Sequence, residues 1–154
     1  MSDTLPQNID AFNRVVAKTL LTLYDQFPTP ADLDGHKVGE QVARELDAGD
    51  NEQTFKIIAS IGPETIEFLV AEGFLSFRRD MRNMDGAGKF PQARLTLRGL
   101  TLLGQVPEGV TQKDESPTLA QRLGEAMRQG ATQGISTAVG KLLFLAGTKM
   151  IGAG

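Results

Sequence analysis

The sequence contains no cysteine and only one histidine, and these absences exclude much of the chemistry that enzymes use. Without cysteine, the chain can form neither a disulfide framework nor a thiolate metal site. With one histidine and no serine in a nucleophile-elbow setting, catalysis would depend on scattered carboxylates. We therefore expect a protein that is not an enzyme and that has no catalytic residues and no cofactor.

The two motifs that come nearest to a ligand site fail on spacing. His36 ends the run Asp-Leu-Asp-Gly-His, whose acidic residues do not keep the spacing of a calcium loop. Residues 85–89 read Asp-Gly-Ala-Gly-Lys, but a Walker motif requires a glycine and a hydroxyl side chain where this chain has Asn83 and Phe90. We expect no metal site, and we interpret residues 85–89 as a flexible loop tip.

An excess of basic residues is also lacking. The formal net charge is −3 and the sequence pI is about 5.2, so any binding of a phosphate backbone would require a local basic patch. The start Met-Ser-Asp-Thr-Leu-Pro-Gln has neither the basic region nor the apolar run of a signal peptide. The 154 residues suffice for one core with an appendage, and we expect a cytoplasmic location.

Apolar residues at three- and four-residue spacing predict a first helix from about residue 10 to residue 27. The polar residues on its other side are Asn13, Arg14, Lys18 and Asp25. Residues 29–32, Thr-Pro-Ala-Asp, predict a capped helical restart, and a second helix is expected over about residues 35–47. Asp50 and Gln53 form a capping pair for a third helix that leads to a junction at Gly62-Pro63.

The stretch from Gly62 to Gln105 predicts a helix, a strand, a loop, a strand and a helix. Proline is typical of the first helical position, so Gly62-Pro63 indicates a helix start, and Gly73 can supply the left-handed end. Apolar and polar residues then alternate at 75–78 and again at 92–95, as expected for two strands. Thr96 can cap a short helix that carries Leu97, Leu100 and Leu103.

This order of elements, with Glu-Gly-Phe-Leu-Ser-Phe-Arg-Arg after the helix and Leu-Thr-Leu-Arg-Gly-Leu-Thr-Leu-Leu after the loop, resembles the winged helix-turn-helix family over about residues 10–105. The resemblance implies a recognition helix, a hairpin wing and double-stranded DNA as the partner. The chain is also similar to small bacterial proteins that join this domain to a glycine-punctuated tail, which implies a fold but no activity. The expected class is mainly α with a small β-hairpin (α+β): a winged-helix domain over 1–105, a linker over 106–117 and a helical tail over 118–154.

The expected recognition helix and the expected wing carry opposite charges. The polar residues of the helix are Glu64, Thr65, Glu67 and Glu72, which would repel phosphates and also fit an ordinary solvated face. The stretch from Arg78 to Arg98 has six basic and two acidic residues. Its candidate nucleic-acid contacts are Arg78, Arg79, Arg82, Lys89, Arg94 and Arg98. The same wing would suit an acidic protein partner, or could be a hairpin whose outer face is protected by arginines.

The tail has an apolar residue at every fourth position from Leu119 to Leu143, which must wind around a straight helix. Its glycines would each weaken an isolated helix by about 1 kcal/mol. A row of small residues would let two helices approach closely, and the expected homo-oligomer contacts are Leu123, Met127, Gly130, Gly134 and Ala138. A broken helix docked on its own domain is the alternative. Lys141 and Lys149 interrupt the apolar segment, so we expect no transmembrane span, while contact with a membrane surface stays open.

Two functions follow from these patterns. The first is a DNA-binding regulator of transcription that grips the backbone through its wing and associates through its tail. The second is a protein-interaction module whose winged helix does not bind DNA and whose tail docks a partner or a membrane surface. The acidic helix favours the second function, and the basic wing is compatible with both.

Overall fold

The computed structural model describes residues 5–82, 86–105 and 117–153, with side chains placed as far as Thr148. It is mainly helical with a small antiparallel sheet, which confirms the predicted class. The elements are α1 (Gln7–Gln26), β1 (Ala31–Asp34), α2 (Gly35–Leu46), α3 (Asn51–Lys56), the π-helical turn η1 (Ile57–Ile61), α4 (Gly62–Ala71), β2 (Leu75–Ser76), the 3-10 turn η2 (Arg79–Met81), β3 (Lys89–Leu95), α5 (Leu97–Leu103), α6 (Leu119–Gln129) and α7 (Thr132–Ala153).

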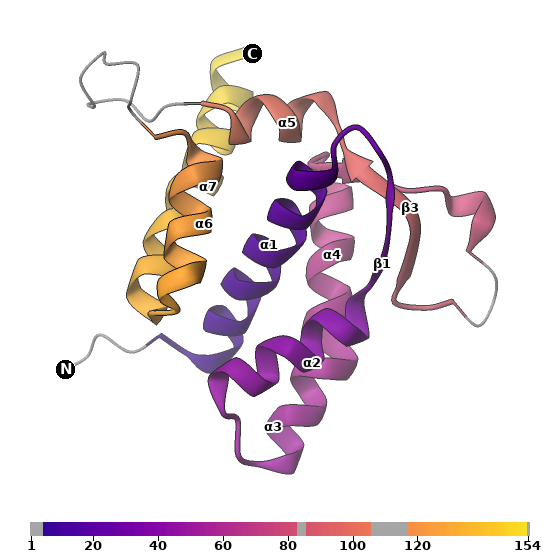
Figure 1. The fold of residues 1–154 in the computed structure, drawn as a ribbon, viewed down its shortest axis with the longest axis vertical. Helices are drawn as coiled ribbons and strands as arrows, with labels where there is room; N and C mark the ends of the chain where they lie inside the picture. The colour runs from indigo at the N-terminus through magenta and orange to yellow at the C-terminus, as the bar shows by residue number, and fades with distance from the viewer. Residues whose placement is uncertain (1–4, 83–85, 106–116, 154) are drawn as a thin grey trace.

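Helix α1 lies at the centre of the molecule, between α2 and α4 on one side and α6 and α7 on the other (Figure 1). The predicted apolar side of α1 is buried, with Val15, Val16 and Leu20 at most 1% exposed. The opposite side is partly buried as well, because Asn13 is only 7% exposed and Arg14 only 5%. The tail covers this polar side of α1, so the first helix is a core element rather than a surface one.

Strand β1 occupies the place of the predicted helical restart, which is therefore wrong. Leu33 points into the core while Asp32 is exposed, and this alternation suits an edge strand. Ala31 pairs with Ala93, and Asp34 pairs with Lys89. The sheet has the order β1-β3-β2, so a third strand joins the predicted pair. The Asp34 carboxylate then caps α2 by accepting from the backbone N–H groups of His36 and Lys37.

Helix α4 begins at Gly62 with Pro63 in its first turn, as predicted, but it continues the preceding helix directly. Helix α3, the π-helical turn and α4 follow one another without a break, and Gly62 keeps helical dihedral angles of φ −57° and ψ −62°. Its N–H donates to the carbonyl of Ile57. A π-helical turn holds more residues than an α-helical one, and here it takes the place of a break before Pro63.

Three glycines allow the backbones of α2 and this long helix to lie in close contact. A Cβ at Gly39 would lie 2.7 Å from the carbonyl oxygen of Ile57, and one at Gly35 would lie 2.6 Å from Cα of Pro63. A Cβ at Gly62 would collide with the carbonyl oxygen of Gly35. Glycine lowers helix propensity, and the close packing of the two helices offsets that cost.

The short helix α5 begins as predicted, since the Thr96 hydroxyl accepts a hydrogen bond from the N–H of Gly99 at 3.1 Å. Its three predicted leucines are buried to different extents. Leu102 and Leu103 are in the core, whereas Leu97 is 76% exposed. Leu97 stands at the first helical position, where the chain has only just left the sheet, and Leu100 is partly buried.

The tail forms two antiparallel helices rather than one, and both pack on α1 (Figure 1). Thr118 begins α6 and forms a capping box with Gln121. Gly130 ends α6 with φ 75° and ψ 4°, a left-handed conformation that glycine adopts without strain. Of the predicted linker 106–117, residues 106–116 lie outside the described residues, and the N–H of Leu119 donates to the carbonyl of Gln105 at 2.7 Å.

A buried polar network fixes the tail on α1. The Arg14 guanidinium donates to Asp10 at 3.0 Å, to Glu45 at 3.3 Å and to the carbonyl of Gly130 at 3.1 Å. It also donates to the hydroxyl of Thr132, which itself donates to Asp10 at 2.8 Å. One side chain of α1 therefore joins α2 and the turn between α6 and α7.

Candidate interaction surfaces

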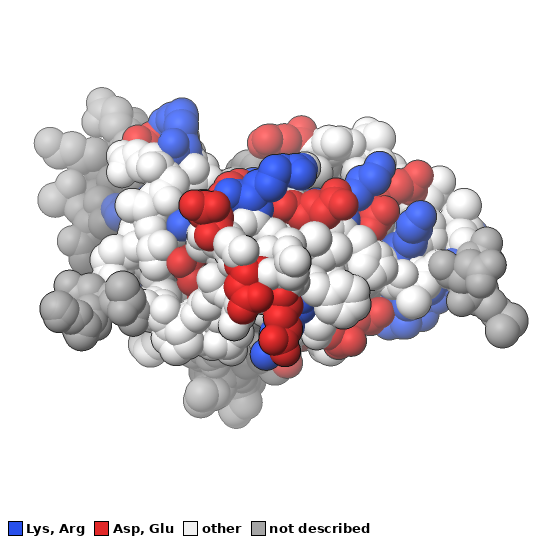
Figure 2. Space-filling model, turned by 90° about the horizontal axis from the view of Figure 1, so that it is seen from below, with Lys and Arg blue, Asp and Glu red and all other residues white. Residues whose placement is uncertain are grey.

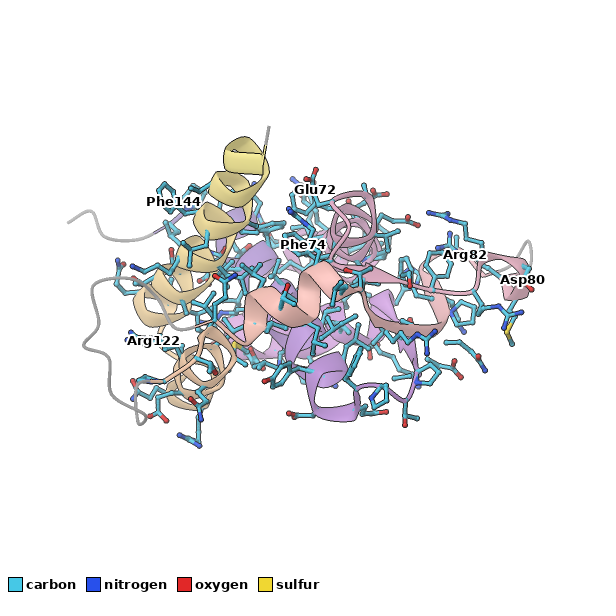
Figure 3. The ribbon with its side chains drawn as sticks, turned by 90° about the horizontal axis from the view of Figure 1, so that it is seen from above. Glu72, Phe74, Asp80, Arg82, Arg122 and Phe144 are labelled. Carbon is cyan, nitrogen blue, oxygen red and sulfur yellow. The ribbon has the colours of Figure 1, made fainter. Side chains whose placement is uncertain are left out.

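The basic residues predicted for the wing gather at one end of the molecule, at and beside the hairpin of β2 and β3. Figure 3 shows Arg82 and Asp80 at this end and Arg122 and Phe144 at the opposite one. Most of these cations have partners within the chain. Their charge is therefore less available to an external phosphate than the sequence alone indicates.

Arg78 is held by Asp80. Its Nε and Nη2 atoms donate to the two carboxylate oxygens of Asp80 at 3.0 Å and 2.9 Å, which is a bidentate geometry. This hydrogen bond lowers the pKa of Asp80 and raises the pKa of Arg78. Both side chains are exposed, so the pair is a surface contact that contributes little to stability.

Arg82 turns inward rather than outward. Its guanidinium lies 4.5 Å from the ring centre of Phe77 and 4.8 Å from that of Phe90, and its Nη1 donates to Glu67 of α4 at 3.2 Å. Sequence reasoning placed Arg82 among the phosphate contacts. In the structure it instead joins the wing to the acidic helix, and one of the carboxylates of that helix is engaged with it.

The remaining wing cations differ in how they are held. The Arg98 guanidinium lies over the ring of Phe74 and donates to the carbonyl of Glu72 at 3.2 Å. The Lys89 ammonium is 3.9 Å from a carboxylate oxygen of Asp34. Arg79 stacks on Phe77, and Arg94 is exposed on β3. Within the described residues, Arg79 and Arg94 are the two predicted contacts without an ion pair or a hydrogen bond from their side chains.

The outward face of the long helix α3–η1–α4 is acidic and partly aromatic. Of the four polar residues expected on this helix, Glu64 and Glu72 are exposed, Glu67 is partly buried and Thr65 is buried. Glu52 of α3 is exposed as well. Two phenylalanines are exposed on the same helix, Phe55 at 70% and Phe68 at 40%. Sequence reasoning identified neither phenylalanine as a surface residue. The edge contact of Phe68 with Phe12, at 5.5 Å between ring centres, holds it beside α1.

Charges of both signs also mix on the end of the molecule that faces downward in Figure 1. Figure 2 shows this end, where basic and acidic side chains alternate instead of forming one basic surface. An electrostatic footprint for duplex DNA would require a continuous basic stripe. The face drawn in Figure 2 does not provide one.

The residues predicted for oligomerisation do not share one surface. Leu123 is fully buried inside the chain, and Gly130 is the left-handed end of α6. Met127, Gly134 and Ala138 lie nearer to the surface. A Cβ at Gly134 would meet nothing within 4 Å, so no helix of the described chain approaches it closely. Gly134 and Ala138 line an open groove of about 1000 Å³ between the end of α1 and the α6–α7 hairpin.

Neither a metal site nor a membrane span emerges from the parts of the chain that the structure describes. No cluster of histidine and carboxylate side chains there could hold a metal ion. Among these residues, no helix is long and apolar enough to cross a bilayer. His36 packs against Gly88 of the loop that precedes β3, where a Cβ would lie 2.5 Å from its ring.

Comparison with known proteins adds no further indication of function. No protein-family model, no curated protein and no solved structure matches the chain.

Proposed function

We propose that this chain is a non-catalytic protein-interaction module that binds a basic, partly apolar segment of a partner protein. The contact surface is the outward face of α3–η1–α4, with Glu64 and Glu72 supplying charge and Phe55 and Phe68 supplying apolar area. The observation that carries the proposal is the combination of exposed carboxylates with exposed aromatic rings on one helix. Aromatic anchors surrounded by charge are typical of protein interfaces.

The arrangement of helices and strands supports a winged-helix reading of this surface. The pairing of β2 with β3 and the packing of α1, α2 and α4 on one another support this proposal. In that reading, α4 takes the place of the recognition helix and β2–β3 the place of the wing. An acidic recognition helix repels phosphates but attracts lysine and arginine side chains, so the same position serves a protein partner.

Binding of duplex DNA through the wing is the second candidate. Arg79 and Arg94 favour it, because neither has an ion pair within the described residues and Arg94 is exposed. Two such cations would give weak, salt-dependent and sequence-independent binding. The engagement of Arg78, Arg82 and Arg98 within the chain is why this function is placed second.

The test measures binding of a labelled lysine- and leucine-rich helical peptide by fluorescence anisotropy. The double variant Glu64→Gln and Glu72→Gln should weaken binding roughly tenfold, since two charges are lost from the face. The matched control is Asp25→Asn and Glu40→Gln, which removes two exposed carboxylates from α1 and α2 and should have little effect. A Phe68→Ser variant should weaken binding as well.

Three results would contradict the proposal. These are absence of peptide binding at low salt, an equal loss in the control pair, and tighter binding of a random duplex DNA than of the peptide. The last result would support the wing as the contact surface, provided that Arg79→Gln with Arg94→Gln lowers the dependence of DNA affinity on salt.

A further inference from the structure

Buried polar atoms without a hydrogen-bond partner are rare in folded proteins, and each one calls for an explanation. Within the described residues there are three such side-chain atoms: the hydroxyl oxygen of Thr19 and the Nε and Nη2 atoms of Arg82. They come from residues 63 positions apart in the sequence, on α1 and on the wing. Both residues nevertheless line the same hollow.

This hollow has a volume of about 760 Å³ and lies where α1, α2, β1, β3 and the wing meet. Its basic lining residues are Lys18, Lys37, Arg82 and Lys89, and its acidic ones are Asp32 and Asp34. The lining therefore has a formal excess of two positive charges in a protein whose total is −3. Leu33, Val38 and Phe90 add an apolar wall.

The two carboxylates of the hollow are already engaged with the backbone. Asp32 accepts a hydrogen bond from the N–H of Gln92 at 2.9 Å, and Asp34 caps α2. The ammonium group of Lys89 approaches Asp34 only to 3.9 Å, and Lys37 is exposed and forms no ion pair within the described chain. Lys18 pairs with Glu45 and Arg82 pairs with Glu67, so Lys37 is the lining cation that has no ion pair within the described residues.

The unpartnered atoms of Arg82 identify the kind of ligand. Glu67 takes the Nη1 end of the guanidinium and leaves Nε and Nη2, the two donors along its side edge. Arg78 uses the same two atoms to hold both carboxylate oxygens of Asp80. This edge matches a pair of oxygens on a carboxylate or a phosphate.

We propose that the hollow binds a small organic anion whose carboxylate or phosphate group accepts two hydrogen bonds from the side edge of Arg82. Lys37 and Lys89 supply further positive charge, the Thr19 hydroxyl supplies a hydrogen bond, and the body of the ligand packs on Leu33, Val38 and Phe90. Both Arg82 nitrogens are shielded from solvent, so binding requires a shift of neighbouring side chains. Met81 lines the same hollow, is 49% exposed and has a flexible side chain. The proposal does not depend on the identity of the protein partner.

The test follows the Nε–H signals of arginine in the full ¹⁵N-labelled chain by NMR. Inorganic phosphate and, separately, acetate replace chloride at constant ionic strength and pH. We expect a saturable shift of the Arg82 signal and of the backbone amides near Thr19 and Lys37, while the Arg94 signal stays in place. The probe with the lower apparent Kd distinguishes a phosphate ligand from a carboxylate ligand.

Two sets of variants make the test specific. Arg82→Lys keeps the charge but removes the two-donor edge, and it should weaken binding roughly tenfold or more in a protein whose amide spectrum remains that of the folded state. Lys37→Gln with Lys89→Gln should also weaken binding, whereas the matched pair Arg79→Gln with Arg94→Gln lies outside the hollow and should not. Chemical shifts that change linearly with the concentration of both probes, without saturating, would overturn the proposal. So would an equal loss of binding in the two pairs of variants.

Discussion

Glycine has opposite consequences in two helical regions of this molecule. Between α2 and the long helix α3–η1–α4, a Cβ on Gly35, Gly39 or Gly62 would collide with backbone atoms of the facing helix. In the α6–α7 hairpin, a Cβ on Gly124, Gly134, Gly140 or Gly147 would meet nothing within 4 Å. The first region therefore uses glycine for close packing. In the second, the low helix propensity of glycine has no compensation within the described chain.

The two regions are consequently stabilised by different means. The contact between α2 and the long helix depends on close approach of the two backbones, so any added atom disturbs it. The tail depends on side chains that reach α1, namely the buried leucines of α6 and the hydrogen bonds of Arg14. A helix with weak intrinsic propensity can persist when tertiary contacts hold it.

The largest effect is expected from Arg14→Met, which removes the centre of the polar network that holds the tail. Asp10 would keep only Thr132 as a partner and Glu45 only Lys18, and the carbonyl of Gly130 would lose a donor. Removing one side of a buried ion pair typically costs about 3–5 kcal/mol of unfolding free energy. Urea unfolding measures this loss, with Lys18→Met as the control, since Lys18 also pairs with Glu45 but is more exposed. Similar losses in both variants would contradict the central role of Arg14.

The next largest effect is expected from Gly62→Ala. The added methyl group would collide with the carbonyl oxygen of Gly35, and both helices would have to separate. Overpacking of this kind costs about 1–3 kcal/mol, although alanine is the better helix former. Thermal unfolding measures the change. A variant as stable as the wild type would show that the α2 interface does not require glycine.

In the tail, replacing glycine by alanine should stabilise the protein rather than destabilise it. Gly134→Ala and Gly140→Ala place a methyl group in open space, so each should raise the unfolding free energy by up to about 1 kcal/mol through helix propensity. Destabilisation by either variant would mean that something covers this side of α7. The comparison between the two regions would then fail.

The smallest change concerns association of the folded chain. If copies of the chain meet through the groove that Gly134 lines, Gly134→Leu should lower the mass measured by light scattering, while Gly134→Ala should leave it near that of the wild type. A wild-type protein that is already monomeric in dilute buffer would remove this role from the groove. The tail would then serve only to cover α1.

The sequence was sufficient to predict elements that depend on local patterns. The apolar period of α1, the cap at Thr96 and the inward residues Ala93 and Leu95 of β3 all follow from short-range chemistry. Helix α2 and the capping role of Asp50 were predicted for the same reason.

Features that depend on distant segments could not be predicted in the same way. Arg14 is buried only because residues 130–132 return to it. Strand β1 exists because β3 supplies hydrogen bonds, while its sequence alone equally suits a helix start. The inward position of Arg82 depends on Glu67, fifteen residues earlier in the chain. The basic residues of the wing were therefore counted correctly, but their availability to an external phosphate was overestimated.

The π-helical turn has a consequence for how the chain tolerates changes in length. Because the turn holds an extra residue, deletion of the exposed Ala59 would convert it into an ordinary α-helical turn and leave α3 and α4 in nearly the same relative orientation. The directions of Phe55 and Glu52 relative to Glu64 would then change little, whereas the same deletion inside α3 or α4 would rotate one part of the helix against the other by about 100°. Within the π-helical turn a single-residue deletion acts as a shortening, and elsewhere in this helix it acts as a change of phase.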